Sequence, residues 1–310
     1  MEKNDVKVSV MVLAYNHEKY IRQALESIVM QQTNFEFEVI IGEDMSTDNT
    51  RVIIKEFQQR YPEIIKPIFR KKNLGACRNV VSTLRRCTGE YVAFLECDDY
   101  WVDPLKLQKQ VDYLECHPEC SGVMTNVRVV NRYGNAMVTG PKVLDCELKN
   151  EMDFVKTMYP YNQFKFIGCF MTRNYYKDGR YDKYLLQAEY VADIIVQAIT
   201  QCKGKIGFID EILSAYRWVP SHGNNFSALK KEVLCKDKIK AIRVLLHLFS
   251  GKAYLRIYMR ICREHWNLIY GYIGEKKYLE LVKYILFHMP LIEKLFYIMY
   301  YVRRKSTGVF

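Results

Sequence analysis

The densest group of chemically capable side chains in the sequence is the acidic turn, Glu96-Cys97-Asp98-Asp99, which follows the apolar run 91–95. Its three carboxylates repel one another unless a cation lies between them. Mg²⁺ and Mn²⁺ prefer such hard oxygen ligands and keep coordination positions open for phosphate oxygens. We therefore predict a divalent metal site that bridges a diphosphate. The alternative is a solvated turn that caps the next helix, but Asp103 already supplies that cap.

Two other pairs of polar residues also follow directly after apolar runs in the sequence. Tyr15-Asn16 follows the run 8–13, and Glu43-Asp44 follows the run 37–41. In sheets of parallel strands, ligands bind beyond the carboxyl ends of the strands. A carboxylate at position 43 or 44 could accept hydrogen bonds from a nucleobase or a ribose. An ordinary strand-to-helix turn would look the same in the sequence.

The elements that must position these groups alternate between strand and helix. Apolar β-rich runs at 8–13, 37–41, 64–69 and 90–95 predict strands, and segments with helical period separate them. Such alternation indicates right-handed crossovers and a mainly parallel sheet. Further along, the pattern predicts a strand at 122–130, a helix at 185–202 and a short strand at 205–209. From about residue 228 the pattern is helical throughout.

The net positive charge of the chain comes from its last part. Residues 228–310 hold 17 Lys and Arg against 6 Asp and Glu, which is the whole formal excess of +11. This imbalance indicates an anionic partner. The apolar, aromatic stretch 284–302 fits a helix at a membrane surface, and a helix packed on the domain fits equally well. Its character suits lipid better than nucleic acid, so we expect no nucleic-acid partner.

The ten cysteines include no C-x-x-C pair, and the N-terminus is polar, without the apolar core of a secretory signal. Unpaired thiols without a signal fit a reducing compartment. We therefore expect a cytoplasmic protein, with peripheral attachment to the inner face of the cell membrane as the further expectation from the basic tail.

Four sequence blocks together resemble one known family. In order and spacing they are similar to the family 2 inverting glycosyltransferases of the GT-A fold, specifically over 6–118 and more faintly to 227. The block 98–110 resembles the bacterial subgroup that builds surface polysaccharides. The blocks are 10–16, 40–48, Asn73-Leu74-Gly75 and 89–99.

The resemblance implies roles for the candidate residues. Asp44 matches the carboxylate that reads the base, and Glu43 stands where an aspartate is usual. Glu96-Cys97-Asp98 matches the DXD motif, so Asp98 would approach ribose and metal, and Asp99 the metal and diphosphate. Tyr15 and Arg78 are expected at the nucleotide-sugar. The implied cofactor is Mg²⁺ or Mn²⁺, and the favoured donor is a UDP-sugar.

An inverting transfer also needs a base that deprotonates the acceptor hydroxyl. The family places an aspartate at a helix start before a turn like Gly204-Lys205-Ile206-Gly207, which selects Asp193. Glu189, expected one helical turn earlier on the same face, is the second candidate. The resemblance further implies that His222 lies over the diphosphate or metal. A solvated helix face, or a surface loop for His222, is the ordinary alternative.

These expectations combine into an α/β protein of the GT-A fold: a Rossmann-like, mainly parallel sheet flanked by helices, with a C-terminal helical tail. The glycosyltransferase domain would span 1–227, with a nucleotide-binding half at 1–118 and an acceptor half at 119–227. The basic tail would span 228–310. The expected activity is transfer of a monosaccharide from a nucleotide diphosphate sugar to a glycan or lipid-linked acceptor in surface polysaccharide synthesis.

Two other functions remain open at this point. A metal-dependent nucleotidyltransferase would need a glycine-rich phosphate loop near the first strand, which residues 12–17 do not offer. A non-catalytic nucleotide-binding protein would keep the pocket but not the chemistry. The sequence lacks the motifs of P-loop NTPases, classical dinucleotide oxidoreductases, zincins and α/β-hydrolases.

Overall fold

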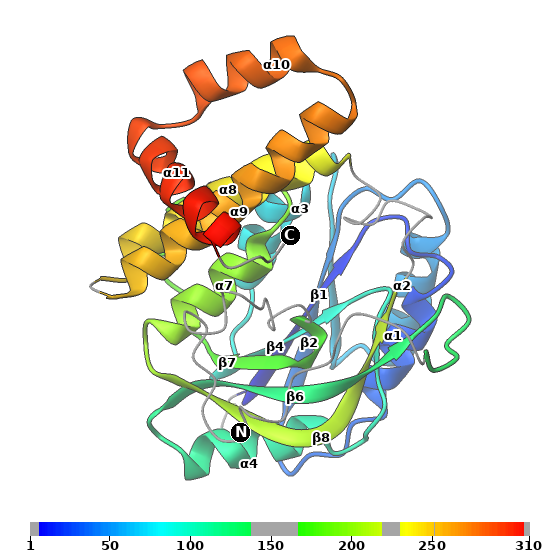
Figure 1. Ribbon diagram of the computed structural model, residues 1–310. Coiled ribbons are helices and arrows are strands. Elements are labelled where there is room, and N and C mark those ends of the chain that lie inside the picture. The colour runs from blue at the N-terminus through cyan, green and yellow to red at the C-terminus, as the bar shows by residue number, and fades with distance from the viewer. Residues whose placement is uncertain (1–5, 138–166, 219–229, 251, 307–310) are drawn as a thin grey trace.

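A computed structural model of the chain describes residues 6–137, 167–218, 230–250 and 252–306 (Figure 1). One eight-stranded sheet runs in the order β3-β2-β1-β4-β7-β6-β8-β5. The strands are β1 Val8–Ala14, β2 Phe37–Glu43, β3 Ile65–Phe69, β4 Tyr91–Glu96, β5 Tyr100–Trp101, β6 Cys120–Val130, β7 Phe170–Arg173 and β8 Lys205–Arg217.

Helices cover both faces of this sheet (Figure 1). The helices of the described chain are α1 Ile21–Val29, α2 Thr50–Arg60, α3 Ala76–Leu84, α4 Lys106–Cys116, α6 Asp182–Leu185, α7 Ala192–Gln201, α8 Lys231–Leu248, α9 Lys252–Gly274, α10 Tyr278–Lys283 and α11 Leu291–Ser306. A 3₁₀ turn, η2 Ile167–Cys169, precedes β7, and a π-helical turn, η4 Tyr284–His288, follows α10.

The first half is the expected parallel sheet. β1 pairs in parallel with β2 and β4, and β2 pairs in parallel with β3. The register sets Ala14 beside Glu43 and Leu13 beside Glu96. Because parallel strands end on the same side, the polar residues that follow β1, β2 and β4 all emerge at one edge of the sheet.

Side-chain alternation along the strands divides the core into two layers. On β1, Met11 packs into the layer formed with α3, α7, α8 and α9, whereas Val10 and Val12 pack into the layer formed with α1, α2 and α4. The helices pack on the sheet through apolar stripes, as in α1, where buried residues recur three and four positions apart. The sheet is therefore clamped from both sides, which fixes the edge that carries the polar residues.

The second half departs from the simple alternation that the sequence predicts. β7 pairs antiparallel with both β4 and β6, and β5 pairs antiparallel with β8. β8 extends to Arg217, well beyond the predicted end at 209. The strands β5 and β7 were not expected, because runs of two and four residues are too short to show a period.

The predicted helix 185–202 is wrong in its first half. The structure has the short α6, then a non-helical turn at 186–191, and α7 starts only at Ala192. Asp237 of α8 explains the break. Its carboxylate accepts the backbone N–H groups of Glu189, Tyr190 and Val191 at 2.7, 2.9 and 3.1 Å. These bonds from a distant segment override the local helical preference.

The basic tail is helical, as expected, and it begins inside the main core. Ile239 and Ile242 of α8, with Ile257 and Ile261 of α9, belong to the same buried layer as α3 and α7. In Figure 1, α10 lies farthest from the sheet. Within the described ranges, no helix is both long enough and apolar enough to cross a bilayer.

The Asp237 contact yields a stability prediction. Asp237 is 3% exposed, and its replacement by alanine would leave three backbone N–H groups without their acceptor, among them that of the buried Val191. We expect Asp237→Ala to lower the free energy of unfolding by about 2–4 kcal/mol, and Asp237→Asn to cost less because one acceptor oxygen remains. Urea denaturation at pH 7 measures both. Lys231→Ala, at an exposed position on the same helix, is the control; an equal loss there would contradict this role of Asp237.

Candidate active site

The acidic turn joins β4 to β5, and its three carboxylates converge. One oxygen each from Glu96, Asp98 and Asp99 lies within 4.8 Å of the other two. Oxygen ligands of an octahedral Mg²⁺ or Mn²⁺ stand about 3–4 Å apart when each is about 2.1 Å from the ion. Small side-chain rotations would therefore close the three oxygens around such an ion. The residues present fit a divalent metal.

The electrostatics of the acidic turn point the same way. Packed protein atoms, together with the charges of Asp98 and Asp193, raise the pKa of Glu96 to about 8, although part of this side chain reaches solvent. Burial and the charges of Asp98 and Glu96 also raise the pKa of Asp99 well above its usual range. A carboxylate whose negative form is disfavoured in this way gains most from a bound cation.

Arg217, at the end of β8, holds the acidic turn in place. Its backbone N–H donates to Asp99 Oδ1 at 2.7 Å, and its Nε donates to the Asp98 carbonyl oxygen at 2.8 Å. The guanidinium is only 4% exposed and lies over the rings of Tyr20 and Tyr100, at 4.7 and 5.5 Å from their centroids. Sequence reasoning missed Arg217, since its partners lie 118 and 119 residues away.

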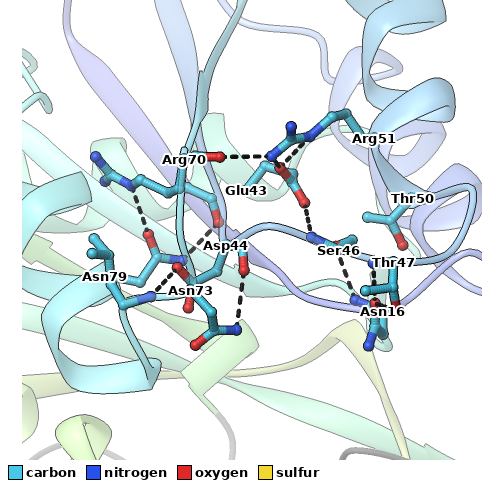
Figure 2. Close-up of polar contacts among 12 residues, drawn as sticks. Asn16, Glu43, Asp44, Ser46, Thr47, Thr50, Arg51, Arg70, Asn73 and Asn79 are labelled. Carbon is cyan, nitrogen blue, oxygen red and sulfur yellow. Dashed lines mark hydrogen bonds and ion pairs between the residues drawn. The ribbon is translucent and has the colours of Figure 1, made fainter.

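At the end of β2, Glu43 takes a different part from the expected one. It is fully buried, and its carboxylate accepts the backbone N–H of Ser46 at 2.6 Å and an ion pair from Arg51 (Figure 2). With no surface of its own, Glu43 cannot touch a nucleotide in this arrangement. The expected contact of Glu43 with the nucleotide-sugar is therefore wrong. Glu43 instead stabilises the turn that carries Asp44.

Asp44 faces the loop after β3. Its Oδ1 accepts the N–H of Leu74 at 2.7 Å and its Oδ2 the N–H of Gly75 at 3.0 Å, while Asn73 donates to the Asp44 carbonyl oxygen. Gly75 has φ +81°, a conformation that favours glycine. A carboxylate has about four acceptor positions, so these two bonds leave acceptor capacity, on a side chain that is only 3% exposed.

The remaining predicted nucleotide residues lie around this edge. Tyr15 ends up partly exposed just beyond β1, and Arg78 is exposed on the first turn of α3. Asn16, at φ +57°, accepts the N–H of Thr47 at 2.8 Å and so ties the end of β1 to the turn after β2 (Figure 2). Arg70 was not predicted. Its buried Nη2 has no hydrogen-bond partner in the described part of the chain, and the charge of Asp44 acts on it.

Asp193 lies in the first turn of α7, and the structure brings it to the acidic turn. Asp193 and Glu96 line one small cavity of about 100 Å³, together with Leu13, Phe94 and Tyr190. Burial raises the pKa of the Asp193 carboxyl, against the N–H of Ile194 and the charge of Lys238, which lower it. A raised pKa suits a group that must accept a proton.

The second candidate base does not share this position. Glu189 lies in the turn before α7, so the predicted placement one helical turn before Asp193 is wrong, and the bonds from Asp237 are the reason. Its side chain is 64% exposed and forms an ion pair with Lys240 of α8 at 2.7 Å. His222, the expected extra metal or phosphate ligand, lies outside the described residues.

Tyr216 is a further residue that the sequence did not single out. It precedes Arg217 on β8, and its pKa is raised by burial and by the charges of the acidic turn and of Asp193. Its phenol therefore lies within the field of the same carboxylates. No signal in the sequence pointed to it, because the predicted strand ended at residue 209.

Comparisons with known proteins find relatives that match part of the sequence. A Mycobacterium tuberculosis protein of uncharacterised function is 47% identical over 127 residues, which cover 41% of this chain and 37% of that protein. The Escherichia coli chondroitin synthase is 32% identical over 133 residues, 43% of this chain and 19% of that enzyme. The chain thus matches well under two thirds of the length of either relative.

A solved structure extends the likeness to the whole fold. Staphylococcus aureus TarS 1-349, in complex with UDP-GlcNAc, superimposes with a TM-score of 0.61 over 95% of this chain and 79% of that one, at 18% identity. The expected GT-A architecture is confirmed. The model of glycosyl transferase family 2 matches residues 9–178, more than half of the chain, and the protein therefore belongs to glycosyl transferase family 2.

Proposed function

We propose that the protein transfers a monosaccharide from a nucleotide diphosphate sugar to a glycan or lipid-linked acceptor in surface polysaccharide synthesis, with inversion at the anomeric carbon. The observation that carries the proposal is that Asp193 and Glu96 of the acidic turn line the same cavity. Membership of family 2 supports it, as do UDP-GlcNAc in TarS and a relative named for the polysaccharide chondroitin.

In this proposal, different residues bind the nucleotide and the diphosphate of the donor. Asp44 would accept a hydrogen bond from the base, uracil being favoured, and Tyr15 and Arg78 would border the nucleotide. Asp98 and Asp99, with Glu96, would hold Mg²⁺ or Mn²⁺. When bound, the ion supplies positive charge that stabilises the diphosphate leaving group. Arg217 keeps the two aspartates in place through the bonds described above.

Asp193 would act as the base. Its carboxylate takes the proton of an acceptor hydroxyl as that oxygen forms a bond to the anomeric carbon, and the bond from that carbon to the diphosphate oxygen breaks with its electron pair. A single displacement from the opposite face inverts the centre. Burial of Asp193 raises its proton affinity without removing it from the cavity.

The tail offers a surface for membrane contact. Large apolar side chains that are half or more exposed recur along α10, η4 and α11: Tyr278, Leu279, Val282, Leu286, Phe287, Leu291, Leu295 and Ile298. These elements belong to the tail 228–310, which holds the whole positive excess of +11, and the larger part of that excess lies before residue 275. An apolar face with basic residues beside it fits the surface of an anionic bilayer. We therefore propose peripheral attachment at the inner face of the cell membrane.

The base assignment predicts the effect of Asp193→Asn. We expect kcat to fall by about 10²–10⁴, because proton removal is lost while the shape is kept, and the KM for the donor to change little. In the unmodified protein, activity should fall with decreasing pH along a limb above the ordinary range for aspartate, since the base must be deprotonated. Steady-state transfer assays measure both. Glu189→Gln is the matched control, and full activity of Asp193→Asn would exclude the assignment.

The metal assignment predicts proton release. With a pKa of about 8, Glu96 is mostly protonated at pH 7 in the metal-free protein, so Mn²⁺ binding should release protons, of which Glu96 alone contributes up to about one per ion. Calorimetry in two buffers of different ionisation enthalpy detects this release. Asp98→Asn and Asp99→Asn should weaken Mn²⁺ binding at least tenfold, and the exposed Asp112→Asn should not. Identical heats in both buffers would contradict the prediction.

The membrane assignment predicts which side chains matter. Phe287 and Leu291 are 77% and 73% exposed, so replacing both with aspartate should leave the fold intact. We expect the double variant to bind vesicles containing phosphatidylglycerol at least tenfold more weakly in flotation assays, because two apolar contacts are lost and two negative charges are added. Tyr133→Asp, at a 74% exposed site far from the tail in sequence, is the control. Unchanged flotation of the double variant would refute the surface.

A further inference from the structure

A second, larger cavity lies between α6 and α8, outside the site described above. Its volume is about 470 Å³, within the usual range for small-molecule sites. Lys183, Tyr184 and Gln187 line it from one side, and Lys240, Arg243 and His247 from α8. We call it the basic cavity. Nothing in the proposed transfer reaction uses these side chains.

The charges of the basic cavity favour an anion. Its permanently charged cations are Lys183, Lys240 and Arg243. Two carboxylates form ion pairs with them: Glu189 with Lys240 at 2.7 Å, and Glu293 with Arg243 at 2.6 Å. Glu293 also accepts a bond from His265 at 2.7 Å, so its charge is shared. No carboxylate among the described residues pairs with Lys183, whose ammonium lies 5.0 Å from the centre of the Tyr184 ring. The neighbouring Asp182 is turned to Arg85 instead.

One of these ion pairs can be exchanged for a ligand. The side chains of Glu189 and Lys240 are 64% and 47% exposed, and an exposed pair of this kind contributes little stability. A doubly charged phosphate group could replace Glu189 on Lys240 and reach Lys183 as well. Such an anion gains two charge-assisted contacts where the single surface pair is lost.

The position of the basic cavity connects it to the acceptor side of the reaction. Gln187 borders the basic cavity, and Tyr190, three residues later, borders the cavity of Asp193. The turn between them is held by Asp237 and Lys240, which lie three residues apart on α8. An anion on Lys240 therefore sits against the same turn that leads into the proposed base.

We propose that the basic cavity binds a phosphate or diphosphate group carried by the acceptor. This inference rests on the proposed function, which supplies the acceptor. The phosphate could belong to a lipid carrier or to a soluble sugar phosphate, and both present the same chemistry to Lys183 and Lys240.

The test is binding of inorganic pyrophosphate, measured by calorimetry in EDTA so that no metal occupies the acidic turn. We expect the unmodified protein to bind it and Lys183→Gln/Lys240→Gln to bind at least tenfold more weakly. Lys231→Gln/Lys276→Gln removes the same charge at exposed positions outside the cavity and should bind normally. Absence of binding to the unmodified protein, or equal binding by the cavity variant, overturns the proposal.

Two further arms separate the sources and the dependencies. With phosphatidylcholine vesicles that contain phosphatidic acid, a lipid source predicts weaker flotation of the cavity variant and competition by pyrophosphate. A soluble source predicts neither. Donor hydrolysis without acceptor should be unchanged in the cavity variant. If donor hydrolysis is normal but the cavity variant binds pyrophosphate as well as the unmodified protein does, this inference alone is refuted. If pyrophosphate binding depends on the two cavity lysines but the protein turns over no donor, the proposed function alone is refuted.

Discussion

Crowding of negative charge at one edge of the sheet is the constraint on which the site depends. The register of β1, β2 and β4 brings the ends of three strands together, and the acidic turn then places three carboxylates within 4.8 Å of one another. The backbone N–H and the guanidinium of Arg217 donate hydrogen bonds to this turn. Burial and this crowding of charge raise the pKa values of Glu96 and Asp99. A divalent ion would resolve the repulsion that the fold maintains.

The tail is joined to this chemistry through the interior of the molecule. Asp237 of α8 fixes the turn before α7, and that turn sets where Asp193 enters the cavity. Apolar residues of α8 and α9 complete the layer that covers one face of the sheet. The outer helices α10 and α11 carry the exposed apolar side chains. In the proposed function, the helical tail would thus position the base through α8 and offer its membrane surface on α10 and α11.

Prediction from sequence succeeded where structure is local and periodic. The parallel half follows from apolar runs and helical stripes, and its strands agree with expectation to within a residue or two at most ends. Prediction failed where distant partners decide. Hydrogen bonds to Asp237 replace the predicted helix with a turn, and Glu189 forms an ion pair with Lys240. The carboxylate of Glu43 forms an ion pair with Arg51. Arg217 gave no signal, because its partners lie on the opposite half of the chain. No period or motif encodes such contacts.

The most direct test of the central claim is electron–nuclear double resonance of Mn²⁺ bound to the protein in the presence of UDP. If the acidic turn holds the ion against the diphosphate, the spectrum will show coupling of Mn²⁺ to ³¹P. That coupling should disappear in Asp98→Asn/Asp99→Asn and persist in Asp193→Asn. No ³¹P coupling in the unmodified protein, or the same coupling without the two aspartates, would contradict the metal site at this edge of the sheet.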